Sequence, residues 1–261
     1  MNAVAAAEPV YLLDHNWEQE PYRLALLEHH ADPTSVRRLQ ATGVGAGWRC
    51  LEVGAGRGSI SRWLSRQVGP LGGVVALDLD TSLLSGLEEP NVEVLCGDVL
   101  DIELPEASFD LIHARLVLMH IPERERAIGR MVSLLRPGGW LVLEELDWMA
   151  VLSDADPDRI ALFRAFDEAL PSIDFECGRA LLDELREAGL GDTTADFRVD
   201  VIEGATALAR WEQLSVQALT EEVLDAGTAT AEQIEAHLAR LENPEYRGYG
   251  FTWIGARGRR A

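Results

Sequence analysis

The sequence contains no lysine, so all 23 of its basic side chains are arginine. A phosphate-binding P-loop requires a lysine, as do pyridoxal-phosphate enzymes and reductases with a Tyr-x-x-x-Lys motif. These three classes are excluded on residue inventory alone.

Positive charge and cysteine are also scarce. The 23 basic residues face 44 acidic ones, and the formal net charge of −21 would repel nucleic acid and anionic membranes. Cys50, Cys96 and Cys177 form no C-x-x-C pair, so we expect neither a disulfide framework nor a metal site. Apolar runs of 18 residues are missing and the first residues lack a basic n-region, so we expect a cytoplasmic location.

Residues 48–145 alternate between short apolar strands and helical stretches. The predicted strands are Trp48–Val53, Gly73–Leu77, Val92–Leu95, Phe109–Ala114 and Trp140–Glu144. The predicted helices are Ser59–Val68, Leu83–Leu87 and Arg124–Leu135, the last ended by a turn at Arg136–Gly139. This alternation specifies an α/β fold, a mostly parallel sheet with helices on both faces.

The flanking segments differ from this core. Two helices, Glu18–His30 and Thr34–Ala41, are expected around Asp32-Pro33 and would form an N-terminal cap. Later segments predict helices at Asp158–Leu170 and Arg179–Ala188, a strand at Phe197–Ile202, two helices within 207–241 and a strand at Gly250–Ile254. With no repeat or linker, we expect a single domain over 1–261: a cap (1–44), a core (45–150), and helices with closing strands on the acceptor side (151–261).

The stretch CLEVGAGRGS, residues 50–59, runs from the end of the first strand into a glycine-rich loop. A dinucleotide loop of the form G-x-G-x-x-G that begins at Gly54 would need glycine where Ser59 stands. The glycines let the backbone approach a ligand closely, and Glu52 beside them would repel a pyrophosphate but suit a cation. The pattern therefore favours a cationic ligand without phosphate over a nicotinamide cofactor.

Two further acids follow the next strands. Asp78 ends the strand VVALD, where an acid can accept both ribose hydroxyls of either NAD or S-adenosylmethionine. Asp98 follows the third strand and could accept from an adenine amine, although it could also simply cap a turn.

The stretches LEVGAGRG, VVALDLD, CGDVLDIELPEASFDLIHARLVLMHIP and LLRPGGWLVLEE resemble class I S-adenosylmethionine-dependent methyltransferases, in the small-molecule branch similar to ubiquinone/menaquinone-biosynthesis methyltransferases. The resemblance implies a Rossmann-like sheet of seven strands in the order 3-2-1-4-5-7-6, with strand seven antiparallel. From their place in the chain, the helices within 207–241 are expected to form an insertion before this last strand. The resemblance also implies the cofactor contacts: Glu52, Gly54, Ala55 and Gly56 at the methionine end, Asp78 and Leu79 at the ribose, Asp98 and Val99 at the adenine, and Arg115 between cofactor and acceptor.

Acceptor residues are predicted from position. Arg115, Glu145, Asp147 and Trp148 follow strands four and five at the carboxyl edge, and we expect Arg115 and Glu145 to face one cavity. His120 is a further catalytic candidate, while His113 could be catalytic or simply buried. Six residues could wall an aromatic or apolar pocket: Tyr11, His15, Trp17, Trp148, Phe163 and Phe166, with core packing as the alternative for the two phenylalanines.

These observations predict an enzyme that transfers the methyl group of S-adenosylmethionine to O, N or C of a small organic acceptor. Methyl transfer from a sulfonium needs orientation and desolvation above all, and a base is optional. Two alternatives stay open: a protein of the same fold that binds the cofactor without methyl transfer, such as a cyclase, and an NAD-dependent oxidoreductase. We expect a monomer or homodimer and a place in secondary or cofactor metabolism.

Overall fold

The computed structural model describes residues 17–261, and one seven-stranded sheet organises them. Its strands are β1 (Arg49–Val53), β2 (Gly73–Asp78), β3 (Val92–Cys96), β4 (Phe109–Arg115), β5 (Leu135–Asp147), β6 (Gly191–Glu203) and β7 (Arg247–Arg259). The order is β3-β2-β1-β4-β5-β7-β6, and β7 runs antiparallel to both of its neighbours. The expected fold class and strand order are confirmed.

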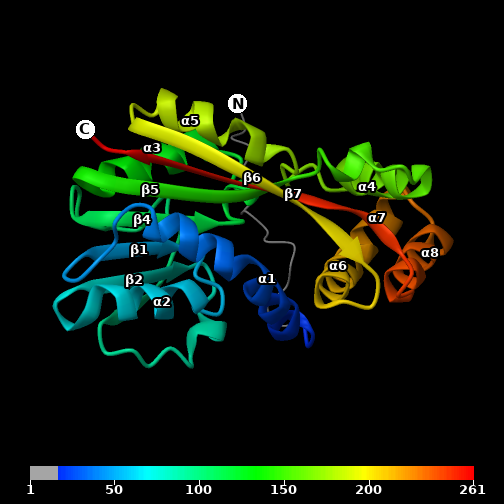
Figure 1. The fold of residues 1–261 in the computed structure, drawn as a ribbon, viewed down its shortest axis with the longest axis horizontal. Coiled ribbons are helices and arrows are strands. Elements are labelled where there is room, and N and C mark those ends of the chain that lie inside the picture. The colour runs from blue at the N-terminus through cyan, green and yellow to red at the C-terminus, as the bar shows by residue number, and fades with distance from the viewer. Residues whose placement is uncertain (1–16) are drawn as a thin grey trace, which may run out of the picture.

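Helices cover both faces of the sheet because its strands alternate in side-chain direction (Figure 1). On one face, Cys50 of β1 packs with Leu39 and Leu64, which come from α1 (Glu20–Gln40) and α2 (Ser59–Val68). On the other face, Leu51 belongs to the main core with residues of α3 (Arg124–Leu134) and α5 (Leu181–Glu187). The strands are therefore buried on two sides.

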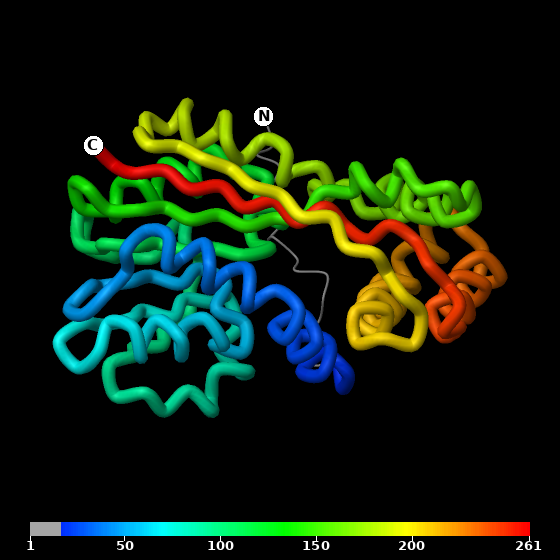
Figure 2. Tube along the Cα trace, in the orientation of Figure 1, coloured from blue at the N-terminus to red at the C-terminus, as the bar shows by residue number. Residues whose placement is uncertain are grey.

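The remaining helices form a separate group beside the sheet. They are α4 (Pro157–Ala169), α6 (Ala207–Ala218), α7 (Thr220–Ala226) and α8 (Ala231–Glu242), and we call them the helical lobe. The tube in Figure 2 shows β6 and β7 running side by side from the sheet to this lobe. Helix α1 contacts both α2 and α6, so it bridges the sheet layer and the lobe.

Several element boundaries differ from the sequence predictions. The cap segment is one continuous helix through Pro33, because Leu24, Leu27, Ala31 and Leu39 bury one side of it along its length. The predicted turn at 136–139 is instead the start of β5, where Leu135 already pairs with Phe109. The segment 207–241 contains three helices rather than two. Where a helix was predicted over Leu83–Leu87, the structure has a short 3₁₀ turn, Ser82–Leu84. No helix of the described part of the chain is long and apolar enough to cross a membrane.

Candidate active site

A cavity of about 820 Å³ lies at the carboxyl ends of the central strands. Its walls come from the glycine loop after β1, the segments after β2, β3 and β4, the helix α1, and α4 and α6 of the helical lobe. Ligands of open α/β sheets bind at this edge, and the volume suits a small-molecule site. The cavity has one end at the glycine loop and the other among the aromatic side chains near the lobe.

The glycine loop adopts a backbone that requires glycine. Gly54, Gly56 and Gly58 have φ values of +69°, +56° and +79°, which non-glycine residues rarely adopt. A Cβ on Gly54 would lie 2.2 Å from Cγ2 of Val117, and a Cβ on Gly58 would lie 3.1 Å from Leu84. All three glycines are thus needed for the backbone conformation, and Gly54 and Gly58 also for close packing.

All nine residues expected to hold the cofactor line this cavity: Glu52, Gly54, Ala55, Gly56, Asp78, Leu79, Asp98, Val99 and Arg115. The Oδ2 atom of Asp78 accepts the N–H of Gly56 at 2.8 Å, which joins the acid after β2 to the glycine loop. Asp98 caps its own turn, because its Oδ1 accepts the N–H of Leu100 at 2.8 Å. These carboxylates are hydrogen-bond acceptors and therefore fit a ligand whose ammonium group, ribose hydroxyls and adenine amine donate.

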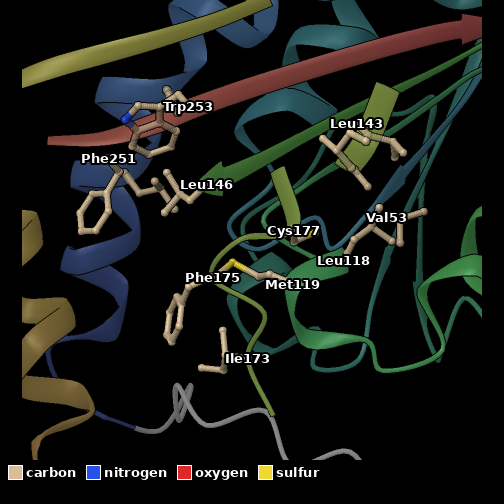
Figure 3. Packing of buried hydrophobic residues seen from close by; sticks show 14 of the residues in the cluster. Val53, Leu118, Met119, Leu143, Leu146, Ile173, Phe175, Cys177, Phe251 and Trp253 are labelled. Carbon is tan, nitrogen blue, oxygen red and sulfur yellow. The ribbon is translucent and has the colours of Figure 1, made fainter. Parts of the chain in front are cut away.

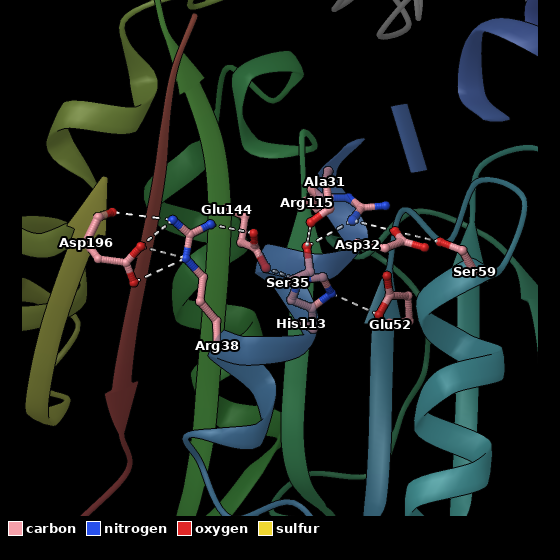
Figure 4. Close-up of polar contacts among 10 residues, drawn as sticks. All are labelled: Ala31, Asp32, Ser35, Arg38, Glu52, Ser59, His113, Arg115, Glu144 and Asp196. Carbon is pink, nitrogen blue, oxygen red and sulfur yellow. Dashed lines mark hydrogen bonds and ion pairs between the residues drawn. The ribbon is translucent and has the colours of Figure 1, made fainter. Parts of the chain in front are cut away.

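His113 lies beneath the cavity rather than in its wall. Its ring is fully buried, with Nδ1 3.0 Å from Glu52 and Nε2 3.0 Å from Glu144 (Figure 4). Although burial opposes protonation, these two carboxylates raise the pKa of His113 to about 9. Burial alone would raise the pKa of Glu144, but its hydrogen bond to His113 and the charges of His113 and Arg38 lower it to about 2. Of the two sequence interpretations, the buried and hydrogen-bonded one describes His113.

The row of charges continues across the sheet through α1. Arg38 donates from one guanidinium nitrogen to Glu144 at 2.6 Å and from another to Asp196 of β6 at 2.6 Å. It crosses β7 over Gly255, where a Cβ would lie 2.2 Å from its Nε. We call Glu52, His113, Glu144, Arg38 and Asp196 the charge row. The sequence did not predict the charge row, because its five residues come from five separate helices and strands.

Arg115 and Glu145 do not face one cavity, so that expectation is wrong. Arg115 lines the cavity and donates to Asp32 and Ser35 of α1, each at 2.9 Å (Figure 4). Glu145 is 1% exposed, is absent from the cavity wall and accepts backbone N–H groups of Val117 and Leu118. Consecutive residues of β5 point to opposite faces, and Glu145 therefore turns away from the side that Glu144 shares with α1.

Asp147 also stays outside the cavity wall. It is fully buried and pairs with Arg179, with N–O distances of 2.7 and 2.8 Å. It also accepts the N–H of Met149 at 2.8 Å. These contacts give Asp147 a structural place at the end of β5 instead of the expected one on the acceptor.

His120 lines the cavity. Burial, with a contribution from the charge of Arg23, lowers the pKa of His120 to about 4. The ring is therefore neutral at neutral pH and can accept or donate one hydrogen bond.

Aromatic side chains wall the other end of the cavity. Those in its lining are Trp148, Phe163, Phe166, Phe175, Trp211 and Phe251. The ring of Trp148 stacks on Phe175 at 3.7 Å between centroids and meets Phe163 edge to face at 5.0 Å. Figure 3 shows Phe175, Phe251, Leu146 and Met119 converging here from separate elements.

The expected aromatic wall is present only in part. Trp148, Phe163 and Phe166 line the cavity, whereas Trp17 is absent from its lining. Tyr11 and His15 lie outside the described residues. Phe175, Trp211 and Phe251 were not found from the sequence. A hydrophobic periodicity marks them as buried but carries no information about which side of the core they face.

Comparison with known proteins defines the class of the core. Residues 51–143 match a family model described as a methyltransferase domain. Residues 51–143 are thus similar to a methyltransferase domain, and the strand order is the one that the resemblance to S-adenosylmethionine-dependent methyltransferases implied.

Two relatives illustrate the sequence similarity. Methyltransferase str2 of Strobilurus tenacellus is 31% identical over 159 residues, which cover 60% of this chain and 56% of that protein. The ubiquinone/menaquinone biosynthesis C-methyltransferase UbiE of Pseudomonas paraeruginosa is 29% identical over 137 residues, 49% of this chain and 50% of that protein. This chain thus spans about half the length of the relatives it matches.

Solved structures share the fold over most of the chain. The YcgJ protein from Bacillus subtilis superposes with a TM-score of 0.59 at 15% identity, covering 89% of this chain and 98% of that one. A phosphoethanolamine N-methyltransferase 2 of Haemonchus contortus in complex with S-adenosyl-L-methionine gives 0.53 at 14%, covering 92% and 52%. The [4+2]-cyclase SpnF gives 0.53 at 20%, covering 89% and 83%.

Proposed function

We propose that this protein transfers the methyl group of S-adenosylmethionine to a small, uncharged, largely apolar acceptor. The observation that carries the proposal is one continuous cavity with a glycine loop and three carboxylates at one end and six aromatic rings at the other. A polar, cationic donor fits the first end and an apolar acceptor fits the second. The match of residues 51–143 to a methyltransferase domain supports the reaction type.

The cofactor, when bound, supplies a methyl group on a positively charged sulfur, and the chain's residues hold and orient the reactants. In this proposal Glu52 binds the ammonium group, Asp78 the ribose hydroxyls and Asp98 the adenine amine. Glu52 is proposed for this role because it lines the cavity and meets His113 through one of its two oxygens, Oε2.

The acceptor is proposed to be uncharged because the charged groups at the aromatic end are already paired. Arg23 donates to both carboxylate oxygens of Glu20, at 2.6 and 2.7 Å. Glu212 accepts two hydrogen bonds from Arg159, at 2.8 and 2.9 Å, and its Oε1 lies 3.0 Å from His237 Nε2. An ionic acceptor would lose water at this end without gaining a free counter-charge.

His120 is the proposed polar contact of the acceptor. It is neutral at neutral pH and lines the cavity, so it can accept the proton of a hydroxyl or amine as that group attacks the methyl carbon. Arg115 is proposed to close the wall between the two reactants, and its role is to order α1 over them through Asp32 and Ser35. Exclusion of water and alignment of the reacting atoms supply most of the rate enhancement.

The proposal also takes the protein to act in the cytoplasm, in secondary or cofactor metabolism, as a monomer or homodimer. Its net charge of −21 argues against nucleic acid as a substrate. The same cavity could shape a cyclisation without methyl transfer, as the shared fold with a [4+2]-cyclase illustrates. Product analysis by mass separates the two, since only methyl transfer consumes the cofactor and adds a CH₂ unit to the acceptor.

Calorimetry with S-adenosylhomocysteine tests the cofactor assignment. We expect binding by the parent protein, no binding of NADH, and at least tenfold weaker binding by Asp78→Ala, because charge-assisted hydrogen bonds contribute about 1.5–3 kcal/mol each. Asp183→Ala is the matched control, since it removes one carboxylate whose side chain is 77% exposed on α5. Affinity of Asp78→Ala within twofold of the parent would show that the ribose assignment is wrong.

A further inference from the structure

Glu145 makes an unusual set of contacts for a buried acid. It is 1% exposed, and its Oε1 accepts the N–H groups of two consecutive residues, Val117 at 3.0 Å and Leu118 at 2.7 Å. Its Oε2 makes no hydrogen bond within the described residues. The hydrogen bonds of this carboxyl group therefore go to one place, the turn that follows β4.

That turn is held in a backbone conformation that its sequence does not favour. Leu116 has a φ of +55°, in the left-handed region that a branched side chain rarely adopts. Its own N–H donates to the carbonyl of Glu144 at 2.8 Å, and the 3₁₀ turn Leu118–His120 follows directly. Such a conformation persists only where surrounding contacts fix it, and Glu145 provides two of them.

The turn forms part of the cavity wall beside the glycine loop. Leu116, Val117, Met119 and His120 all contribute to the cavity wall. Val117 packs so closely on the glycine loop that a Cβ on Gly54 would overlap its Cγ2, at 2.2 Å. A small displacement of the turn would therefore change the shape of the cavity beside Gly54.

We propose that Glu145 is a positioning residue, which fixes the turn 116–120 against Gly54 and thereby sets the wall between the cofactor end and the aromatic end of the cavity. The carboxyl oxygen acts through the backbone of Val117 and Leu118 and does not touch either reactant. The functional part of this inference rests on the proposed cofactor site, whereas the structural part, the anchoring of the turn, is independent of it.

Three substitutions and one control test the inference. Glu145→Gln keeps an acceptor oxygen at the same reach, Glu145→Asp shortens that reach by one methylene, and Glu145→Ala removes it. Asp110→Ala is the control, because Asp110 is also a buried carboxylate that accepts a backbone N–H, from Arg49 at 2.7 Å, but near the amino end of β4. Asp110→Ala therefore removes a buried hydrogen-bond acceptor, as Glu145→Ala does, but at the opposite edge of the sheet.

The readouts are amide hydrogen exchange of the peptide spanning the turn and calorimetric affinity for S-adenosylhomocysteine. For Glu145→Ala and Glu145→Asp we expect exchange of the Val117 and Leu118 amides at least tenfold faster and affinity at least fivefold lower. For Glu145→Gln and Asp110→Ala we expect both quantities within twofold of the parent. The aspartate variant keeps the test decisive if the alanine variant does not fold.

Any other result contradicts either the anchoring of the turn, its effect on the cofactor site, or the proposed function. If Glu145→Asp leaves exchange of the turn unchanged, or if Glu145→Gln loses protection as fully as Glu145→Asp, the carboxyl oxygen does not anchor the turn and the inference is wrong. If the turn loosens but affinity stays within twofold, Glu145 does not set the cofactor wall. If the parent itself fails to bind S-adenosylhomocysteine, the proposed function fails, while the exchange data still decide whether Glu145 anchors the turn.

Discussion

Replacing the imidazole at the centre of the charge row is the sharpest test of how the site is held together. His113→Gln keeps a polar side chain of similar length but removes the positive charge between two buried carboxylates, Glu52 and Glu144. The variant therefore leaves two negative charges facing a neutral group where the parent has alternating signs. Near pH 6.5 we expect a lower free energy of unfolding and weaker binding of S-adenosylhomocysteine.

Two arguments give the magnitude of the lost stability. Breaking a buried ion pair by removing one partner typically destabilises a protein by about 3–5 kcal/mol. Independently, the rise in the pKa of His113 from 6.5 to about 9 corresponds to about 3–4 kcal/mol, because each pKa unit is about 1.4 kcal/mol. We therefore expect a loss of about 3 kcal/mol, large beside the 5–15 kcal/mol of a typical domain.

The sign of the pH dependence follows from the direction of the shift. A histidine whose folded-state pKa is raised contributes its full stabilisation below the unfolded-state value and loses it as the pH rises through the folded-state value. The difference in unfolding free energy between parent and His113→Gln should thus be largest at pH values below about 6.5 and shrink as the pH rises through about 9. Other groups titrate in both proteins and largely cancel.

Urea unfolding of both proteins at several pH values between 6 and 9.5 measures this difference. Asp196→Asn is the control, because it removes the charge at the exposed end of the same row, where the side chain is 57% accessible, and should lower stability by less than about 1 kcal/mol. A difference for His113→Gln that stays constant from pH 6 to 9.5 would refute the assignment of a buried imidazolium.

Three further outcomes are expected. Gly54→Ala should lose S-adenosylhomocysteine binding more than tenfold, since its Cβ would meet Val117 at 2.2 Å and its φ is positive; binding within twofold of the parent by calorimetry would contradict the tight packing. Gly255→Ala should destabilise the protein by about 1–3 kcal/mol by displacing Arg38 from the charge row, and an unchanged urea midpoint would count against it. Burial raises the pKa of Glu145 to about 8, although backbone hydrogen bonds and the charge of Arg124 oppose this shift. Between about pH 4.5 and 8 the carboxyl group is therefore protonated in the folded state and ionised in the unfolded state, so the free energy of unfolding falls as the pH rises through this window. Relative to the parent, Glu145→Gln should therefore gain stability over that window, and equal pH profiles in urea unfolding would show that the carboxyl group is ionised throughout.

The sequence by itself determined the parts of the molecule whose cause is local. The spacing of Gly54, Gly56 and Gly58 sets a backbone with positive φ. The acid Asp78 ends the apolar strand β2, and Asp98 lies two residues beyond β3. Because parallel strands place their carboxyl ends at one edge, the chain order of these residues was sufficient to bring them to one cavity. The lack of lysine likewise restricted the chemistry without any knowledge of the fold.

Only the tertiary structure decided what depends on which side of an element a side chain faces. Position alone predicted a shared cavity for Arg115 and Glu145, but a one-residue step along β5 reverses side-chain direction, and it is Glu144 that lies on the side of α1. The charge row required five elements to meet, and Pro33 ended no helix because buried contacts on both sides of it favoured continuation. The aromatic end of the cavity depends in the same way on how the helical lobe packs against β7, an arrangement between residues far apart in the chain that no local pattern encodes.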